Sequence, residues 1–274
     1  MIKLIASDLD GTLLNRAKEI PEFTRRVLGE ATARGIHFVP ATGRAFAAVP
    51  EEVRQFPGVE YVITSNGATI YSVSQGRRIY QCLMDGEAAE ALIKIPRSEG
   101  VVLEAFVEGE PYSETRYVEN PQKYGATEYG ARYVKKTRHP VPDMEAFIRQ
   151  NRNRLDSIAF VCNEENERER LRGSFQQQKD IYVTSSVSHL LEIGHKDAGK
   201  GNTLLWLLRF LGISPSEAAA FGDADNDIEM LSGVKYGFAM ANGTESCKEA
   251  AFGVTGSNEE DGVGTAVIRL LRGE

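Results

Sequence analysis

The sequence predicts an α/β protein in which a doubly wound parallel sheet, formed by residues 1–83 and 190–274, carries an inserted α+β domain at 84–189. Two observations predict this class. Short apolar runs alternate with amphipathic helical stretches in both outer segments, which is typical of βαβ units. The middle segment differs, because its tyrosines, charges and turn residues are denser.

The N-terminal elements follow in order. Residues 2–7 form a short apolar run that ends in an acidic loop. Pro21 can open the first helix, and Gly35 stands where that helix would end. The apolar runs at 36–40 and 61–64 are the next predicted strands. Each of these strands leads into a loop with Ser, Thr, Asn or Gly, residues that favour turns.

The C-terminal segment repeats the pattern. Residues 203–211 predict a strongly apolar helix that Gly212 terminates. Residues 218–221 read as a fully buried strand, and 228–231 and 263–271 as helices. In such sheets ligands bind beyond the carboxyl ends of the strands. The polar loops that follow the strands are therefore expected to converge.

The middle segment contains candidate strands at 101–107 and 158–161 and candidate helices at 144–150 and 164–171. Its strands look alternating rather than continuously apolar. Alternation predicts an antiparallel sheet with one face exposed to water.

Composition narrows the partners and the compartment. The net charge of −7 disfavours nucleic acid and anionic membranes, which bind basic surfaces. No apolar stretch reaches membrane-spanning length. The three cysteines form no CxxC pair, and no leader precedes the first strand. A cytoplasmic protein is expected.

The first candidate catalytic residues lie in the Asp-Leu-Asp-Gly-Thr-Leu run that starts at Asp8. A phosphoryl acceptor must be anionic, aligned with the leaving oxygen, and screened by a cation. Asp10 could protonate the leaving group and later activate water. A solvated acidic turn is the plain alternative for this run on its own.

A second acidic cluster follows the strand at 218–221. Asp223, Asp225 and Asp227 have calcium-loop spacing, but Ile228 stands where that loop needs Gly, and its terminal Glu is also missing. Unpaired carboxylates at the mouth of a buried strand would be costly. A hard cation such as Mg²⁺ is therefore predicted there.

Residues 194–201 fit the phosphate-loop pattern GxxxxGK, but Gly201 replaces the final Ser or Thr that would hold Mg²⁺. Lys200, just before a helix, still suits a single phosphate-binding cation. Thr42 and Gly43 supply a hydroxyl and a flexible backbone after a strand.

Taken together, the DxDGT run, the Thr-Gly loop, the Lys-Gly pair and the GDxxND run resemble, in this order, the haloacid dehalogenase (HAD) superfamily of phosphotransferases. Residues 65–68, 241–243 and 258–263 further resemble Cof-type phosphatases of subfamily IIB. The motifs that match lie in 1–83 and 190–274. The middle segment matches the family only in its size and in its alternation of predicted strands and helices. Only a helix and a strand fit before the Thr-Gly loop, so the insert stands where the C2B-type cap of this family belongs.

The resemblance implies a role for each residue of the first and last motifs. Asp8 would be the nucleophile and a Mg²⁺ ligand. Asp10 would be the general acid/base, with its main-chain carbonyl also on the metal. Asp223 would be the third protein ligand, and Asp227 would orient the motif lysine or the metal shell.

The phosphate would be held by Thr42, Gly43 and Lys200, of which Lys200 would also offset the charge of the nucleophile. Asn226 would contact the phosphate or a water bound to the metal. The implied activity is Mg²⁺-dependent hydrolysis of small phosphomonoesters through an aspartyl-phosphate. Sugar phosphates are the first expectation, ahead of phosphorylated cofactors.

The insert would close over the substrate and choose its leaving group. Arg116, Tyr117 and Tyr124 are candidates for this role, with a solvated polar face as the plain alternative. A phosphomutase, or a phosphatase dedicated to mannosyl-3-phosphoglycerate or sucrose phosphate, stays open on the same fold. A receiver-like switch is a distant alternative, because it has no use for Asp10 or a cap. The oligomeric state does not follow from the sequence.

Overall fold

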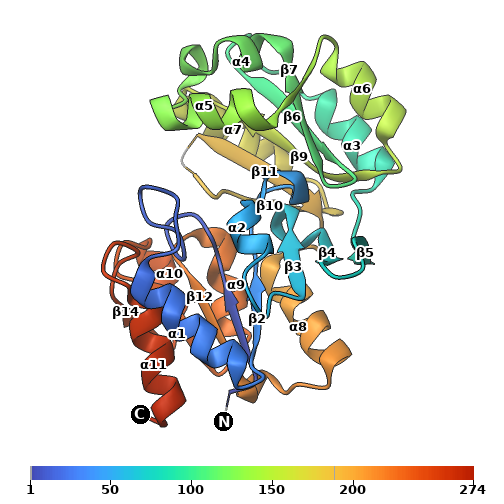
Figure 1. Cartoon of the computed structure of the whole chain (residues 1–274). Helices are drawn as coiled ribbons and strands as arrows, with labels where there is room; N and C mark the ends of the chain where they lie inside the picture. Colours follow the sequence, from blue (N-terminus) through green and yellow to red (C-terminus); the bar gives the residue numbers. More distant parts are fainter. Residues whose placement is uncertain (1, 188) are drawn as a thin grey trace. The chain divides into compact units, whose positions relative to one another are not determined.

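The structure, a computed structural model, describes residues 2–187 and 189–274 and consists of two compact units (Figure 1). The core unit comprises Met1–Gly43, Pro50–Tyr80 and Gly199–Glu274. The insert unit comprises Arg44–Val49 and Gln81–Ala198.

The core unit is built on a five-stranded parallel sheet with the strand order β14-β13-β12-β1-β2. Strand β1 lies between β12 and β2, and the chain leaves it toward β2 but returns on its other side as β12. The order therefore reverses between β1 and β12, which is where doubly wound sheets bind ligands. The strands are β1 (Leu4–Ser7), β2 (His37–Pro40), β12 (Ala218–Gly222), β13 (Tyr236–Met240) and β14 (Gly253–Thr255).

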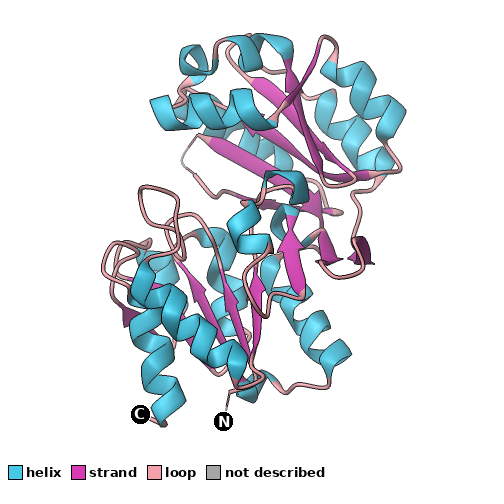
Figure 2. Cartoon of the chain, in the orientation of Figure 1, coloured by secondary structure: helices cyan, strands magenta, loops and turns pink. Residues whose placement is uncertain are grey.

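Helices cover both faces of this sheet (Figure 2), which explains why β1 and β12 are buried along their whole lengths. Helices α8 and α9 contact each other on one face, where Leu204, Leu207 and Leu208 pack on the strands. Helices α1 and α11 lie side by side on the other. The helices are α1 (Glu22–Ala33), α2 (Glu51–Arg54), α8 (Lys200–Leu211), α9 (Ile228–Ser232), α10 (Glu245–Ala250) and α11 (Gly262–Arg272).

The predicted strand at 61–64 belongs to a separate three-stranded sheet of β3 (Tyr61–Thr64), β4 (Thr69–Ser72) and β5 (Arg77–Gln81). Strand β3 runs antiparallel to β4. A single parallel bridge between Ala41 and Ile63 joins it to the end of β2. The loop after β3 thereby lies next to the loop after β2.

The insert unit contains a six-stranded sheet with the order β10-β11-β9-β6-β7-β8. Neighbouring strands are antiparallel except for the parallel pair β7 and β8. The predicted antiparallel character is thus confirmed for most of the sheet. The strands are β6 (Val102–Val107), β7 (Glu110–Glu114), β8 (His139–Val141), β9 (Leu155–Val161), β10 (Ile181–Thr184) and β11 (Leu190–His195).

The expectation of one wet face is wrong for the central strands β6 and β9, which are buried along their full lengths. Helices α3, α6 and α7 supply the apolar residues on one face. On the other face Tyr117, Tyr124 and Val134 pack on the strands. The helices are α3 (Gly86–Ile93), α4 (Thr115–Glu119), α5 (Glu128–Thr137), α6 (Met144–Asn151) and α7 (Glu165–Phe175).

The insert unit extends beyond the predicted insert of 84–189. Strand β11 begins at Leu190, and it pairs with β9 and β10. The separate segment Arg44–Val49 also belongs to the insert unit, where Ala45 packs against Phe106 and Ala159. No helix in residues 2–187 and 189–274 is long and apolar enough to cross a membrane.

Candidate active site

The first and last acidic motifs meet because the strands before them are neighbours. Asp8 follows β1 and Asp223 follows β12, and the Asp8 N–H still donates to the Phe221 carbonyl at 2.9 Å. Carboxyl ends of parallel strands lie at one edge of the sheet. Two motifs separated by more than two hundred residues in the chain therefore form one site.

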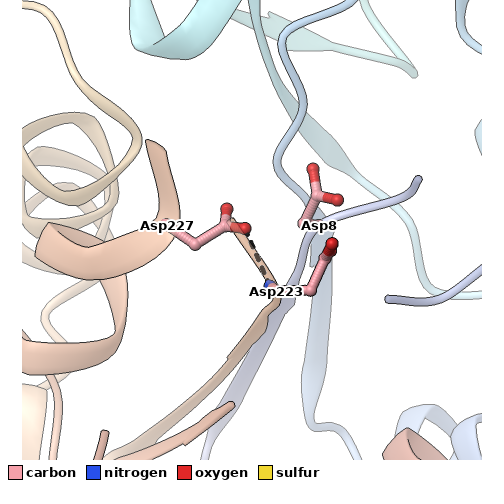
Figure 3. A group of neighbouring side chains, drawn as sticks. All are labelled: Asp8, Asp223 and Asp227. Carbon is pink, nitrogen blue, oxygen red and sulfur yellow. Dashed lines mark hydrogen bonds between the residues drawn. The ribbon is translucent and has the colours of Figure 1, made fainter. Parts of the chain in front are cut away.

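Three carboxylates converge at this edge of the sheet. Asp8, Asp223 and Asp227 each offer an oxygen, and these oxygens lie within 4.8 Å of one another. Their side chains point toward a common region in Figure 3. One Asp227 oxygen accepts the N–H groups of Asp223 at 3.0 Å and Ala224 at 3.1 Å, so its carboxylate closes the turn after β12.

Lys200 neutralises part of this charge. It is the first residue of α8, its side chain is fully buried, and its ammonium donates to Asp8 at 2.6 Å and to Asp227 at 2.7 Å. Burial alone would lower the pKa of Lys200, but Asp227 and Asp8 raise it above the ordinary value. Lys200 is therefore protonated at neutral pH.

One lysine does not balance three carboxylates. Burial, opposed by Lys200, and the neighbouring Asp227 and Asp223 leave the pKa of Asp8 well above its ordinary value. Burial and Asp227 likewise raise the pKa of Asp223 to about 6. Oxygen donors with this unbalanced charge suit a hard divalent cation such as Mg²⁺.

A buried amide oxygen supports the same fit. Asn226 Oδ1 has no hydrogen-bond partner among the described residues, although the side chain is only 3% exposed. An orphaned acceptor of this kind needs a donor from outside the protein. A water molecule bound to a cation supplies such a donor.

Gly11 and Thr12 of the first motif determine the position of the Asp223 carboxylate. The Thr12 hydroxyl donates to Asp223 Oδ1 at 2.6 Å. Gly11 has a φ of +88°, and a Cβ at this position would lie 2.5 Å from Asp223 Oδ2. A larger residue than glycine would therefore displace the carboxylate.

Asp10 has different partners. Its side chain pairs with Lys18 at 2.8 Å and is 39% exposed, so it lies toward solvent rather than in the buried carboxylate group. Lys18 has a φ of +64° in the loop that follows the motif. Nothing in the local sequence distinguishes Lys18 from a surface lysine, and sequence reasoning missed this contact.

Thr42 and Asn226 are joined through a residue to which the sequence assigned no role. The Thr42 carbonyl accepts the Asn66 N–H at 3.1 Å, and Asn226 Nδ2 donates to Asn66 Oδ1 at 3.0 Å. Thr42 itself is buried, whereas Gly43 beside it is partly exposed. The motif of residues 65–68 was the only signal for Asn66.

The residues considered for the insert make structural contacts. Tyr117 and Tyr124 are buried with their rings edge to face at 5.8 Å. Arg116 donates to the carbonyls of Glu99 and Val101 and to the Glu114 carboxylate. The solvated polar face is also wrong for the two tyrosines.

Known proteins resemble this chain over nearly its whole length. A family model described as haloacid dehalogenase-like hydrolase matches residues 5–267. The 5-amino-6-(5-phospho-D-ribitylamino)uracil phosphatase YwtE of Bacillus subtilis is 29% identical over 292 residues, covering 100% of this chain and 99% of the relative.

Solved structures share the whole fold. A haloacid dehalogenase-like hydrolase from B. subtilis superimposes with a TM-score of 0.84 and 27% identity, covering 98% of this chain and 100% of the other. The subclass IIB sugar phosphatase BT4131 has the same fold, with a TM-score of 0.82, 23% identity and 98% of each chain covered. The resemblance is confirmed: the chain belongs to the haloacid dehalogenase superfamily and is a Cof-type phosphatase, a hydrolase of phosphoric monoesters.

Proposed function

We propose that this phosphatase hydrolyses small sugar or polyol phosphates with Mg²⁺, through an aspartyl-phosphate (an acyl phosphate) formed on Asp8. The observation that carries the proposal is the buried Asp8 carboxylate, which is held by Lys200 at 2.6 Å beside Asp223 and Asp227. A carboxylate placed in this way is oriented and partly screened by Lys200, and a bound divalent cation would keep it anionic, as a phosphoryl acceptor must be.

In the first step an Asp8 oxygen attacks the phosphorus in line with the leaving oxygen. The bond between phosphorus and the leaving oxygen breaks, and Asp10 gives that oxygen a proton. Asp10 suits the role because its carboxylate lies outside the buried group and is reached by solvent. The free alcohol then departs.

In the second step Asp10 takes a proton from a water molecule, whose oxygen attacks the phosphorus. The bond to Asp8 breaks, inorganic phosphate leaves, and the Asp8 carboxylate is restored. Lys200 contributes in both steps by holding Asp8 in place and placing positive charge where phosphate oxygens gather. Thr42 and Gly43 would bind those oxygens with hydroxyl and N–H groups.

Mg²⁺ would be held by Asp8, Asp223 and the main-chain carbonyl of Asp10, and it would offset the charge of the transferring phosphoryl group. Asp227 is assigned to positioning, because Lys200 and two N–H groups already occupy its oxygens.

The substrate class draws on two relatives. One is named a phosphatase of a phosphoribitylamino uracil and one a sugar phosphatase. Both names describe a phosphate ester on a polyhydroxylated carbon chain. We extend that class to this chain, with a small phosphorylated metabolite as the partner and the cytoplasm as the place of action.

The test is a panel of sugar, polyol and cofactor phosphates, assayed for released phosphate with and without Mg²⁺. Asp8→Asn should abolish turnover, and Asp10→Asn should lower kcat by about 10²- to 10⁴-fold, which is the usual contribution of a general acid/base. Asp180→Asn, which changes an exposed carboxylate of the insert unit, is the matched control and should retain full activity.

Metal-independent turnover, or full activity of Asp8→Asn, would refute the mechanism. Rapid quenching of the native enzyme should yield a phosphorylated peptide that contains Asp8. If the product is an isomeric sugar phosphate rather than inorganic phosphate, the enzyme is a phosphomutase and the hydrolytic proposal is wrong.

A further inference from the structure

A thiol and an imidazole meet where the two ends of the long insert segment Gln81–Ala198 come together. Cys82 is the second residue of that segment and follows β5 directly. His195 lies near its other end, as the last residue of β11. Cys82 Sγ and His195 Nδ1 share a hydrogen bond of 3.3 Å. Neither side chain has a role in the proposed phosphatase mechanism.

The imidazole is held with its Nδ1 toward the thiol. The Asp197 main-chain N–H donates to the same nitrogen at 3.2 Å. A main-chain N–H can only donate, so Nδ1 is the basic nitrogen of the neutral ring. Asp197 Oδ2 lies 3.7 Å from Nδ1, so an imidazolium formed by proton transfer from the thiol would face a carboxylate. A nucleophile, a base within hydrogen-bond reach and a group that orients the base form the arrangement that activates cysteines.

The three cysteines of the chain have different surroundings. Cys162 and Cys247 are buried, and burial raises the pKa of Cys162 to about 11 and that of Cys247 to about 12. Almost no thiolate exists at these two positions near neutral pH. Cys82 is partly exposed and has a base beside it. Access and a partner that favours the thiolate are what distinguish a reactive cysteine from a structural one.

We propose that Cys82 is a modification site, at which His195 takes the thiol proton and the sulfur forms a mixed disulfide with a low-molecular-weight disulfide. Cys82 and His195 lie outside the carboxylate group of the phosphatase site. The modification is therefore independent of the proposed function.

The reaction is an exchange of one disulfide for another. Cys82 gives its proton to His195 Nδ1, and its sulfur attacks one sulfur of the disulfide. A new S–S bond forms, the old one breaks, and the departing thiolate takes the proton from His195. One thiol and one disulfide are consumed and one of each is formed, so the disulfide is the only oxidant needed. A free thiol reverses the modification by the same route.

The expected gain in rate depends on pH. An ordinary cysteine, with a pKa of about 8.5, is only about 0.3% thiolate at about pH 6. Proton transfer to His195 increases that fraction, but a less basic thiolate is also a weaker nucleophile. The net gain should be about tenfold at about pH 6 and should vanish by about pH 9. Asp180 also faces the imidazole, and Lys196 at 2.9 Å balances its charge.

The test follows the reaction of the native protein with dithiodipyridine, which releases a coloured thiopyridone for each thiol that reacts. One thiol should react fast, and all three should react after unfolding in guanidinium. Peptide mapping after the fast phase should place the adduct on Cys82, and dithiothreitol should remove it. Cys82→Ala should lose the fast phase. Cys162→Ala, which truncates a buried thiol of the same unit, is the matched control and should retain it.

His195→Asn separates the base from the hydrogen bond. The asparagine amide still accepts a hydrogen bond beside the thiol, but it takes no proton. The rate at Cys82 should fall about tenfold at about pH 6 and should equal or exceed the native rate at about pH 9. His139→Asn, which changes an exposed histidine of the same unit, should leave the rate unchanged at both pH values. Circular dichroism of each variant establishes that it is folded.

Three results would overturn the inference. One is a native protein without a fast phase. Another is an adduct on Cys162 or Cys247, which peptide mapping of the native protein detects without any variant. The third is a His195→Asn variant that keeps the native pH profile, at the same rate or at a uniformly lower one, because a merely structural role of the imidazole would have that effect.

Discussion

The three carboxylates of the site differ in the side chains that contact them, and these contacts determine how much of their negative charge is balanced. Asp8 and Asp227 share the Lys200 ammonium, whereas Asp223 receives the Thr12 hydroxyl. Removing Lys200 would leave two buried carboxylates without their cation. Loss of one partner of a buried ion pair is more costly than loss of a surface pair.

Lys200→Met should therefore lower the free energy of unfolding by about 3–5 kcal/mol near neutral pH. Without the lysine, burial keeps the folded-state pKa of Asp8 above its unfolded value. A group of this kind contributes stability below its unfolded pKa and loses it as pH rises through the folded pKa. The deficit should thus be larger at about pH 8 than at about pH 5.

Urea unfolding of the native protein and the variant at both pH values measures this difference. Lys196→Met is the control, because Lys196 pairs with Asp180 in an exposed ion pair. That change should leave the free energy of unfolding nearly unchanged, because an exposed pair is screened by solvent. A Lys200→Met deficit that is equal at the two pH values would contradict the argument.

The pKa of Asp223 makes a second prediction. Because burial and Asp227 raise that pKa to about 6, metal binding below this pH must displace a proton. The apparent Kd for Mg²⁺ should rise about tenfold for each pH unit below 6 and change little above about pH 7. Calorimetry in buffers of different ionisation enthalpy counts the protons released, and zero release at low pH would contradict the prediction.

At the scale of elements, the pair α1 and α11 depends on close approach at a glycine. A Cβ on Gly264 would lie 2.8 Å from Thr24 Oγ1 and 2.9 Å from Phe23 Cδ1. Gly264→Val should therefore lower the free energy of unfolding by about 1–3 kcal/mol through overpacking. Gly29 in α1 has open space around it, and Gly29→Ala should raise stability by about 0.5–1 kcal/mol.

Denaturant unfolding of the two glycine variants compares them directly. Catalytic activity should be retained in both, because neither glycine contacts the site. Equal stability of Gly264→Val and the native protein would show that the two helices can separate without cost.

At the scale of the molecule, each unit has its own apolar core, and all proposed Mg²⁺ ligands belong to the core unit. Binding to the folded state stabilises only the part that must unfold to release the ligand, by about 2.7 kcal/mol at 100 times Kd. Mg²⁺ should therefore slow amide hydrogen exchange in β1 and β12 and leave β6 and β9 unchanged. Exchange mass spectrometry tests this, and equal slowing in β6 and β9 would mean that the units open together.

The fold was predictable where burial and local pattern agree. The continuous apolar runs of β1 and β12 were correctly predicted to be strands, because both faces of a strand in a parallel sheet are covered and therefore apolar. The same logic misjudged β6 and β9, because Glu104 and Asp156 interrupt their apolar pattern although both side chains are buried. Arg138 pairs with Glu104 and the Gly109 N–H donates to Asp156, partners that lie far away in the sequence.

By itself the sequence determined the family of this protein and the class of reaction that it catalyses. The acidic motifs, the motif lysine and their order specify a phosphatase of the haloacid dehalogenase superfamily. Residue type and spacing along the chain are local properties, so they can be read without a structure.

Only the tertiary structure decided which side chains meet. Asp227 joins Asp8 and Asp223 in the carboxylate group, while Asp10 turns toward Lys18. Asn66 reaches Asn226 across 160 positions of the chain. The direction of a side chain beyond a strand end depends on backbone angles and neighbours that the fold brings together, and no local pattern carries that information.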